Sequence, residues 1–338
     1  MAMDKSKILN ILKVVLFLGI GFFFIYWFLL KLDVETRQAI WDSFRSANYF
    51  WVVVAMLVSV LSHILRALRW NMLLGSIGHG VKLGHSFGAV MIAYLANLAV
   101  PRLGEVLRCG MLLDSDKVPV QKSLGTVVTE RVVDVLAFGL TILLGLALVF
   151  NQLKDWLYDQ LVTKVSTLPS MGTVVLVLAI LLVAVVAAYL LFYKKLLKYK
   201  LFAKIHNLIV GFFEGIKSIA HLRRPWLFVF YSLAIYFLYF LGGYIIFLAL
   251  PETATLPFVA ALLLYIFGTV GMMVTPGGIG LYPVLVWQAV AIYGVSQQAG
   301  LASGWLLWSS QQVVVIILGV AYLVKFSVLK NTHRQNEL

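Results

Sequence analysis

Long apolar runs separated by short polar segments extend along the whole chain. A helix needs about 20 apolar residues to cross the hydrocarbon core of a bilayer. Six uninterrupted runs come close to or exceed that length: residues 8–30, 49–65, 124–150, 172–192, 226–250 and 301–324. The pattern predicts six full membrane-spanning helices. The first run is too long for the core of a signal peptide and no small-residue cleavage site follows it, so we expect it to be retained.

Two further apolar runs are interrupted by proline and glycine. Residues 86–100 lead into Pro101-Arg-Leu-Gly104-Glu, and residues 256–275 lead into Pro276-Gly277-Gly278-Ile-Gly280. Non-helical backbone persists at membrane depth only where protein or a watery cavity covers it. Paired interruptions at corresponding positions of two halves indicate a transporter's substrate site. We therefore predict two re-entrant broken helices whose breaks meet near the midplane.

The segment order predicts an inverted repeat. With the N-terminus inside, the first broken segment enters from the inner side and the second from the outer side. The half-repeats cover about residues 49–150 and 226–324, and they run in opposite directions through the membrane. Alternatively, each broken segment crosses fully as two short helices, which raises the number of spans.

Composition supports a single integral membrane domain over residues 1–338, all-α and polytopic. Hydrophobic residues make up 62% of the chain, charged residues only 12%, and the mean hydropathy is +0.96. Cys109 is the only cysteine, so an intrachain disulfide and a thiolate metal cluster are excluded. The six histidines show no metal-ligand spacing, and we expect no cofactor.

The net charge of +13 reflects membrane orientation and not a nucleic-acid surface. Most Lys and Arg residues fall on segments that this topology places inside, as the positive-inside rule requires. We therefore expect both termini in the cytoplasm and no nucleic-acid partner. Residues 194–224 carry an apolar stripe at helical spacing between lysines, which predicts an amphipathic linker on the inner leaflet. A plain connector without functional lipid contact explains this pattern equally well.

Charged residues lie inside one predicted span. Glu130 and Asp134 are four residues apart, so they share a helix face, and Arg131 lies beside them. A charge at bilayer depth costs about 2.5–3.5 kcal/mol even on a lenient scale, so these groups must face protein or water. They form either an internal salt bridge with Arg102 or Arg108, or part of a cavity that binds an ion or headgroup.

The first break has charged neighbours. Arg102 and Arg108 lie on either side of the predicted restart of the helix near Gly104. A helix N-terminus and forked guanidiniums both suit a phosphate. The alternative is that the two arginines anchor the segment at the inner surface. The second break carries no charge and lacks the lysine of a nucleotide-binding loop; a tight packing turn without ligand is its alternative.

The candidate site combines these elements. The expected substrate-binding residues are Arg102, Arg108, Arg131, Glu105, Glu130, Asp134 and Asn97. The arginines would neutralise a phosphate, and the carboxylates would hold them or accept a coupling proton. The expected hinges of the broken helices are Pro101, Gly104, Pro276, Gly277, Gly278 and Gly280. By contrast, we interpret His63, Arg66, Arg69 and Trp70 as interfacial anchors at the end of a span.

Several of these motifs together resemble the flippase-like family named for the transmembrane region of lysylphosphatidylglycerol synthase. The resemblance rests on Arg66-Ala-Leu-Arg69-Trp70, Asn97 with Pro101-Arg-Leu-Gly-Glu105 and Arg108, Gly125-Thr-Val-Val with Glu130-Arg131 and Asp134, and Pro276-Gly-Gly-Ile-Gly280. It implies a prokaryotic inner-membrane protein that moves lipids or lipid-linked molecules between leaflets. A well-known relative is the membrane half of the multiple peptide resistance factor.

The chain departs from this family in two ways. The relative carries a soluble aminoacyl transferase domain, for which a chain ending at Leu338 leaves no room, so we expect no enzymatic lysine transfer. Family members often have an acidic residue after the second break, where this chain has Tyr282-Pro283.

The resulting hypothesis is a flippase for an anionic lipid or a lipid-linked substrate. One alternative is a membrane partner of a separately encoded enzyme that modifies lipid headgroups, and another is a lipid-binding scaffold that transports nothing. Expected partners are membrane lipids, with a homo-oligomer or such an enzyme as further candidates.

Overall fold

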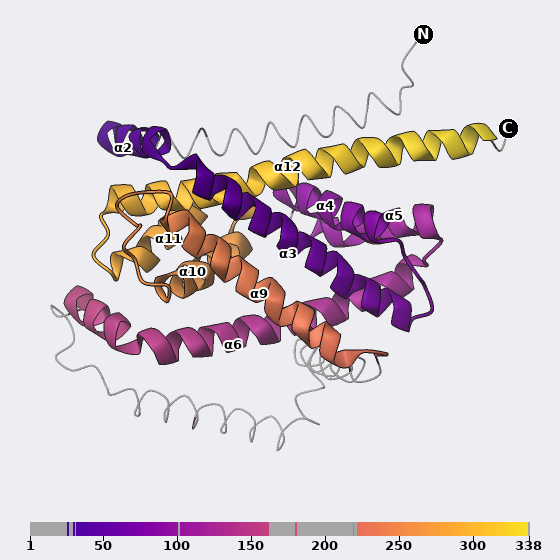
Figure 1. Ribbon diagram of the computed structural model, residues 1–338, viewed down its shortest axis with the longest axis horizontal. Helices are drawn as coiled ribbons and strands as arrows, with labels where there is room; N and C mark the ends of the chain where they lie inside the picture. Colours follow the sequence, from indigo (N-terminus) through magenta and orange to yellow (C-terminus); the bar gives the residue numbers. More distant parts are fainter. Residues whose placement is uncertain are drawn as a thin grey trace, which may run out of the picture.

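The regular structure of the described chain is helical. The computed structural model describes residues 32–100, 102–161 and 222–336, with a few isolated positions besides. The predicted spans 8–30 and 172–192, nearly all of the linker 194–224, and Pro101 lie outside the described residues. In chain order (Figure 1), the helices are α2 (Val34–Ser46), α3 (Tyr49–Ser76), α4 (Leu83–Ala99), α5 (Leu103–Asp116), α6 (Val120–Leu161), α9 (Pro225–Phe247), α10 (Ala260–Val274), the short 3-10 helix η1 (Pro276–Gly278), α11 (Leu281–Ala291) and α12 (Gln297–Asn336).

Four helices are long and apolar enough to cross a membrane: α3, α6, α9 and α12. They correspond to the four predicted spans that fall within the described residues. Helices α3, α6 and α12 continue beyond their predicted ends, and α3, predicted to stop at residue 65, continues to Ser76. The polar residues that suggested an end to the span are buried within the protein, so the helix continues through them.

Both predicted breaks are present, and each joins two helices into an antiparallel hairpin. In the first hairpin α5 folds back along α4, and a Cβ at Gly104 would overlap the backbone of Ala93. The close approach of the two helix backbones therefore requires glycine at position 104. At the open end of the hairpin, away from the break, His85 Nδ1 lies 2.9 Å from Asp116 Oδ2.

The second hairpin is formed by α10 and α11. A Cβ at Gly271 would lie 2.9 Å from the Cα of Tyr282, so the two helices cross closely beside the break. Farther along, Leu263 of α10 and Ala289 of α11 are buried in one cluster. The intervening turn has positive φ at Gly277, Gly278 and Gly280, a conformation that glycine adopts without penalty.

The tips of the two hairpins touch each other. A Cβ at Gly277 would lie 3.2 Å from Leu98 Cδ2 and 3.6 Å from Leu98 Cα. Leu98 is in the last turn of α4, next to the first break. The breaks thus meet, although they are about 180 residues apart in the sequence.

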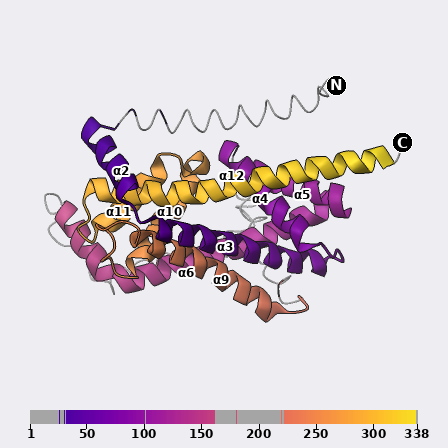
Figure 2. The same ribbon diagram turned by 45° about the horizontal axis from the view of Figure 1, so that its top comes forward.

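Helix α12 runs past both hairpins (Figure 2). Near its start, Gly304 lies against Pro283 of α11; farther along, Gly319 lies against Leu95 of α4. Small residues allow helix backbones to approach closely inside a membrane. One long helix therefore supports the two hairpins at different points along its length.

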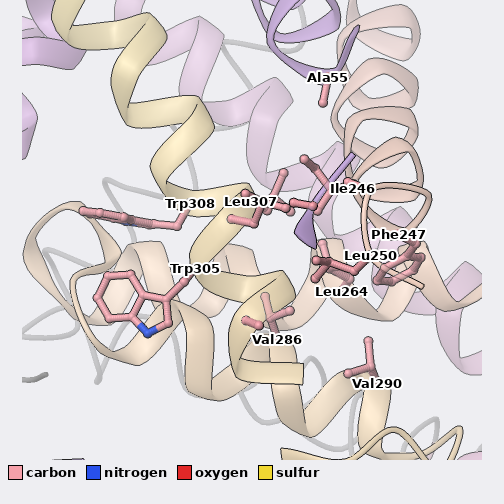
Figure 3. Packing of buried hydrophobic residues seen from close by; sticks show 14 of the residues in the cluster. Ala55, Ile246, Phe247, Leu250, Leu264, Val286, Val290, Trp305, Leu307 and Trp308 are labelled. Atoms are coloured by element: carbon pink, nitrogen blue, oxygen red, sulfur yellow. The ribbon is translucent and has the colours of Figure 1, made fainter. Parts of the chain in front are cut away.

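The main hydrophobic core surrounds the second hairpin. It gathers buried side chains from α3, α9, α10, α11 and α12 (Figure 3), among them Ala55, Ile246, Phe247, Leu250, Leu264, Val286, Val290, Trp305, Leu307 and Trp308. Helices α3 and α9 also pack along each other, crossing the molecule together (Figure 1). Each predicted half-repeat contains a long helix, a hairpin and a long helix in that order; their inverted orientation in the membrane stays a prediction.

Candidate functional site

Glu130 of α6 is the centre of a buried ionic cluster. Its side chain is 0% exposed. Its Oε1 accepts hydrogen bonds from Arg66 at 3.2 Å and Arg69 at 3.1 Å, and its Oε2 accepts one from Arg108 at 2.8 Å. Arg131 lies 3.6 Å away. One carboxylate thus connects α3, α5 and α6.

Asp134 lies one helical turn farther along α6 and contacts many of the same groups. It accepts hydrogen bonds from Arg69 at 2.7 Å and Arg66 at 3.1 Å, and it pairs with Arg131 at 3.2 Å. The hydroxyl of Tyr236, on α9, donates to it at 3.0 Å. We call Arg66, Arg69, Arg108 and Arg131, with Glu130 and Asp134, the arginine cluster.

The arginine cluster has more positive than negative charge. Four guanidiniums surround two carboxylates, which leaves an excess of two positive charges among these six residues. Removing charges from water is costly, and pairing compensates this cost only where opposite charges match. The unbalanced positive charge therefore favours negatively charged groups beside the cluster, and the carboxyl group of Glu105 is one such neighbour.

Aromatic rings enclose the guanidiniums. The Arg108 guanidinium lies 4.5 Å from the centre of the Trp70 ring, a cation–π distance. Trp70 is itself held by a 2.9 Å hydrogen bond from its Nε1 to Thr126 of α6. On the other side, Arg66 donates to the hydroxyl of Tyr239 at 3.0 Å. These contacts fix the orientation of the guanidiniums.

A small cavity of about 30 Å³ adjoins the arginine cluster. This exceeds the space of about 10–15 Å³ that one water molecule needs. It is lined by residues of four helices: Arg66, Val90, Ala93, Tyr94, Asn97, Glu105, Arg108 and Arg131. The cavity is therefore a polar space inside an apolar protein, between the first hairpin, α3 and α6.

The structure places six of the seven predicted substrate-binding residues in the arginine cluster or along the adjoining cavity. Glu130 and Asp134 pair with Arg108 and Arg131, and Glu105 lines the adjoining cavity. The interpretation of Glu130 and Asp134 as an internal salt bridge is confirmed, with Arg108 as one of the partners.

Asn97 also has a structural role at the break, whereas Arg102 lies apart from the site. Asn97 lines the cavity, and its Oδ1 accepts a 2.8 Å hydrogen bond from the backbone N–H of Gly104 across the break. It thus satisfies one of the donors that the start of α5 was expected to offer to a ligand. Arg102 is exposed, adopts a left-handed conformation directly before α5, and does not line the cavity.

The interpretation of Arg66 and Arg69 as interfacial anchors is wrong. Both side chains are buried, as are His63 and Trp70. They pair with carboxylates more than 60 positions later in the chain, so no snorkelling to the surface occurs. A pair of arginines three apart in one span, matched by two carboxylates four apart in another, is a signal that could have revealed this pairing.

Other contributors to the site gave no signal in the sequence. Ser232, Tyr236 and Tyr239 of α9 all contact the arginine cluster. They lie in an apolar run in which tyrosine and serine are unremarkable. Within the described ranges, no three His, Cys, Asp or Glu side chains come together as metal ligands.

A family model describes most of this chain. The model of the lysylphosphatidylglycerol synthase TM region matches residues 10–319. The chain belongs to this family. No curated protein and no solved structure matches it.

Membership of the lysylphosphatidylglycerol synthase TM region family agrees with the helical membrane architecture and with a role connected to lipids. Seven of the motif residues that suggested the family come together in space. Arg66, Arg69, Trp70, Arg108, Glu130, Arg131 and Asp134 meet at one ionic cluster, although they come from three separate helices.

Proposed function

We propose that this protein moves lipids with an anionic phosphate headgroup, or lipid-linked substrates of that kind, between the leaflets of a prokaryotic inner membrane. The observation that carries this proposal is the excess of guanidinium groups over carboxylates in the arginine cluster, in which three of the four arginines are buried. A charged headgroup crossing hydrocarbon unaided faces a large barrier. Guanidiniums held in place beside a polar cavity lower that barrier, because they replace water around the phosphate.

Arg131 gives the cluster a connection to the molecular surface. Its side chain is 46% exposed, whereas those of Arg66, Arg69 and Arg108 are buried. A headgroup that reaches Arg131 from outside would next meet the cavity lined by Arg66 and Arg108. Arg102, exposed at the first break, is suited to the earliest contact with the phosphate.

The hairpins supply the elements that would alternate access to the cavity. Their tips touch through Leu98 and Gly277, and the first hairpin contributes both Glu105 and Arg108 to the site. In the proposed arrangement both hairpins are re-entrant and enter from opposite sides, and both termini are cytoplasmic. On this proposal the chain transports lipid and performs no covalent chemistry on it.

Reconstitution in liposomes tests the proposal. Labelled phosphatidylglycerol in the inner leaflet is followed by its accessibility to an impermeant quencher, with a neutral glycolipid of the same acyl chains as comparison. We expect accelerated exchange of phosphatidylglycerol only, and an Arg131→Gln variant should slow it about tenfold or more, the loss of a charge-assisted contact of about 1.5–3 kcal/mol. Lys122→Gln is the matched control, because Lys122 is exposed on the same helix and makes no ion pair among the described residues.

Two results would refute the proposal. One is exchange in protein-containing liposomes that is no faster than in empty ones. The other is an Arg131→Gln variant that moves phosphatidylglycerol as fast as the wild type.

A further inference from the structure

Glu105 differs from the other two carboxylates of the site in its partners. Glu130 and Asp134 are each held by several guanidiniums, whereas Glu105 forms no ion pair with any described residue. Its Oε2 atom is buried and has no hydrogen-bond partner within the described part of the chain. A buried carboxylate oxygen without a partner is costly, which points to a functional role for this position.

Positively charged side chains from three helices share the cavity with Glu105. From α5, α3 and α6 respectively, Arg108, Arg66 and Arg131 line the same cavity, so their guanidinium groups place positive charge beside the Glu105 carboxyl group. Glu105 also lies in the first turn of α5, where the helix dipole favours a negative charge. From α4, the uncharged residues Val90, Ala93, Tyr94 and Asn97 face the cavity.

We infer that Glu105 is the proton-binding residue of a coupled cycle, in which one proton accompanies each lipid anion. This inference rests on the proposed function. When a phosphate enters beside Arg108 and Arg131, its negative charge cancels part of their field and repels the carboxylate. Glu105 then takes up a proton from the aqueous side on which the headgroup entered, forming one O–H bond.

The proton leaves when the headgroup leaves. As the phosphate departs on the other side, the arginine field is restored, the O–H bond breaks, and the proton passes to water on that side. A monoanionic headgroup and one proton move together, so the step transfers no net charge. Glu130 and Asp134 remain ionised throughout the transport cycle, because the arginines paired with them stay in place.

Linkage provides the test, because anion binding and protonation must strengthen each other by the same factor. Purified protein in detergent is titrated with short-chain phosphatidylglycerol, whose phosphodiester does not titrate near neutral pH. Calorimetry in two buffers of different ionisation enthalpy gives the number of protons taken up. We expect up to one proton per bound lipid, and an affinity that rises about fivefold or more as the pH is lowered from neutral to about 5.

Variants assign the proton to its residue. Glu105→Gln, which resembles the protonated side chain, should bind the lipid with high affinity at every pH and without proton uptake. Glu252→Gln is the control, because Glu252 is exposed in the loop after α9. His63→Gln is a second control, because the ring of His63 lies 4.8 Å from that of Tyr94, which lines the cavity. Both controls should keep the proton uptake of the wild type.

The outcomes separate the inference from the proposed function. If the wild type binds no phosphatidylglycerol, the proposed function itself fails. Binding without proton uptake, or uptake that persists in Glu105→Gln, overturns only the coupling. A parallel titration with sulfate distinguishes the source of the anion: uptake with sulfate and none with phosphatidylglycerol would mean that the coupled ligand is a free anion, and it would overturn coupling to lipid. Should Glu105→Gln fail to fold, the two-buffer experiment on the wild type still decides whether a proton accompanies the lipid.

Discussion

Arg69 of α3 and Asp134 of α6 form the shortest ion pair of the arginine cluster, with Nη2 and Oδ1 2.7 Å apart. The Arg69 side chain is 0% exposed, and its Nη1 also donates to Ser232 of α9 at 3.3 Å. This one residue of α3 therefore contacts both α6 and α9.

Replacing Arg69 by Met should destabilise the protein strongly. The change leaves Asp134 and Glu130 with fewer partners in a buried position, and breaking such a pair costs about 3–5 kcal/mol. The single cysteine, Cys109, is buried and reports unfolding through its reaction with a thiol-specific dye during heating. We expect labelling of Arg69→Met at a clearly lower temperature than in the wild type. Arg45→Met, at an exposed position of α2, should change nothing, and equal midpoints for all three proteins would contradict the assigned role.

Gly277 should not tolerate a side chain. Its φ of +60° strains any L-residue by about 1–2 kcal/mol. A Cβ would also press on Leu98 across the contact between the hairpin tips. We expect Gly277→Ala to lower the thermal midpoint and to slow lipid exchange in liposomes. A second change, Leu98→Ala, should restore part of the loss by relieving the contact while the backbone strain remains.

Gly110 is the matched control for this position. It lies inside α5, and a Cβ added there would meet no described atom within 4 Å. Gly110→Ala should be neutral or stabilise the protein by up to about 1 kcal/mol, because alanine favours the helix. A destabilisation equal to that of Gly277→Ala would argue against a special role for the turn.

Trp308 should stabilise the turn of the second hairpin. Its Nε1 donates a 2.7 Å hydrogen bond to the carbonyl of Gly277, linking α12 to the tip. Trp308→Phe removes the donor and should cost about 1 kcal/mol. Hydrogen exchange of the amides around Gly278 would report the loosening as faster exchange. Trp226→Phe serves as control, because Trp226 is 85% exposed, and exchange around Gly278 should be unaffected.

Asp33 should make the start of α2 sensitive to acid. Its Oδ1 accepts a 2.7 Å hydrogen bond from the N–H of Thr36 as an N-cap, and this bond lowers the pKa of the carboxyl group. Because the folded pKa is below the unfolded value of about 3.9, the stabilisation is complete above that pH and is lost as the pH falls through the folded pKa. In the wild type, the protection of the Thr36 amide, measured as its exchange rate relative to that of the unfolded chain at the same pH, should fall in acid. An Asp33→Asn variant, which caps without titrating, should lack the pH dependence of this stabilisation; an identical acid response in both would exclude Asp33 as its cause.

The sequence predicted local features well. Proline and glycine placed the two breaks, because their backbone chemistry acts within a few residues. The uninterrupted apolar runs placed the four described spans, because hydrophobicity is likewise a property of each short segment. The end of α3 was misjudged because His63, Arg66 and Arg69 look like an interfacial boundary when their distant partners are unknown.

The sequence by itself therefore determined which segments are apolar helices, where two of them break, and that ionisable groups lie among them. Only the tertiary structure decided that Leu98 meets Gly277, that Arg102 remains outside, and that Arg69 pairs with Asp134. Hydrophobicity and backbone preference are properties of each short segment, whereas an ion pair between α3 and α6 depends on how helices far apart in the chain pack. For that reason the charges could be identified from the sequence, but their pairing, and the lack of an ion-pair partner for Glu105 among the described residues, could not.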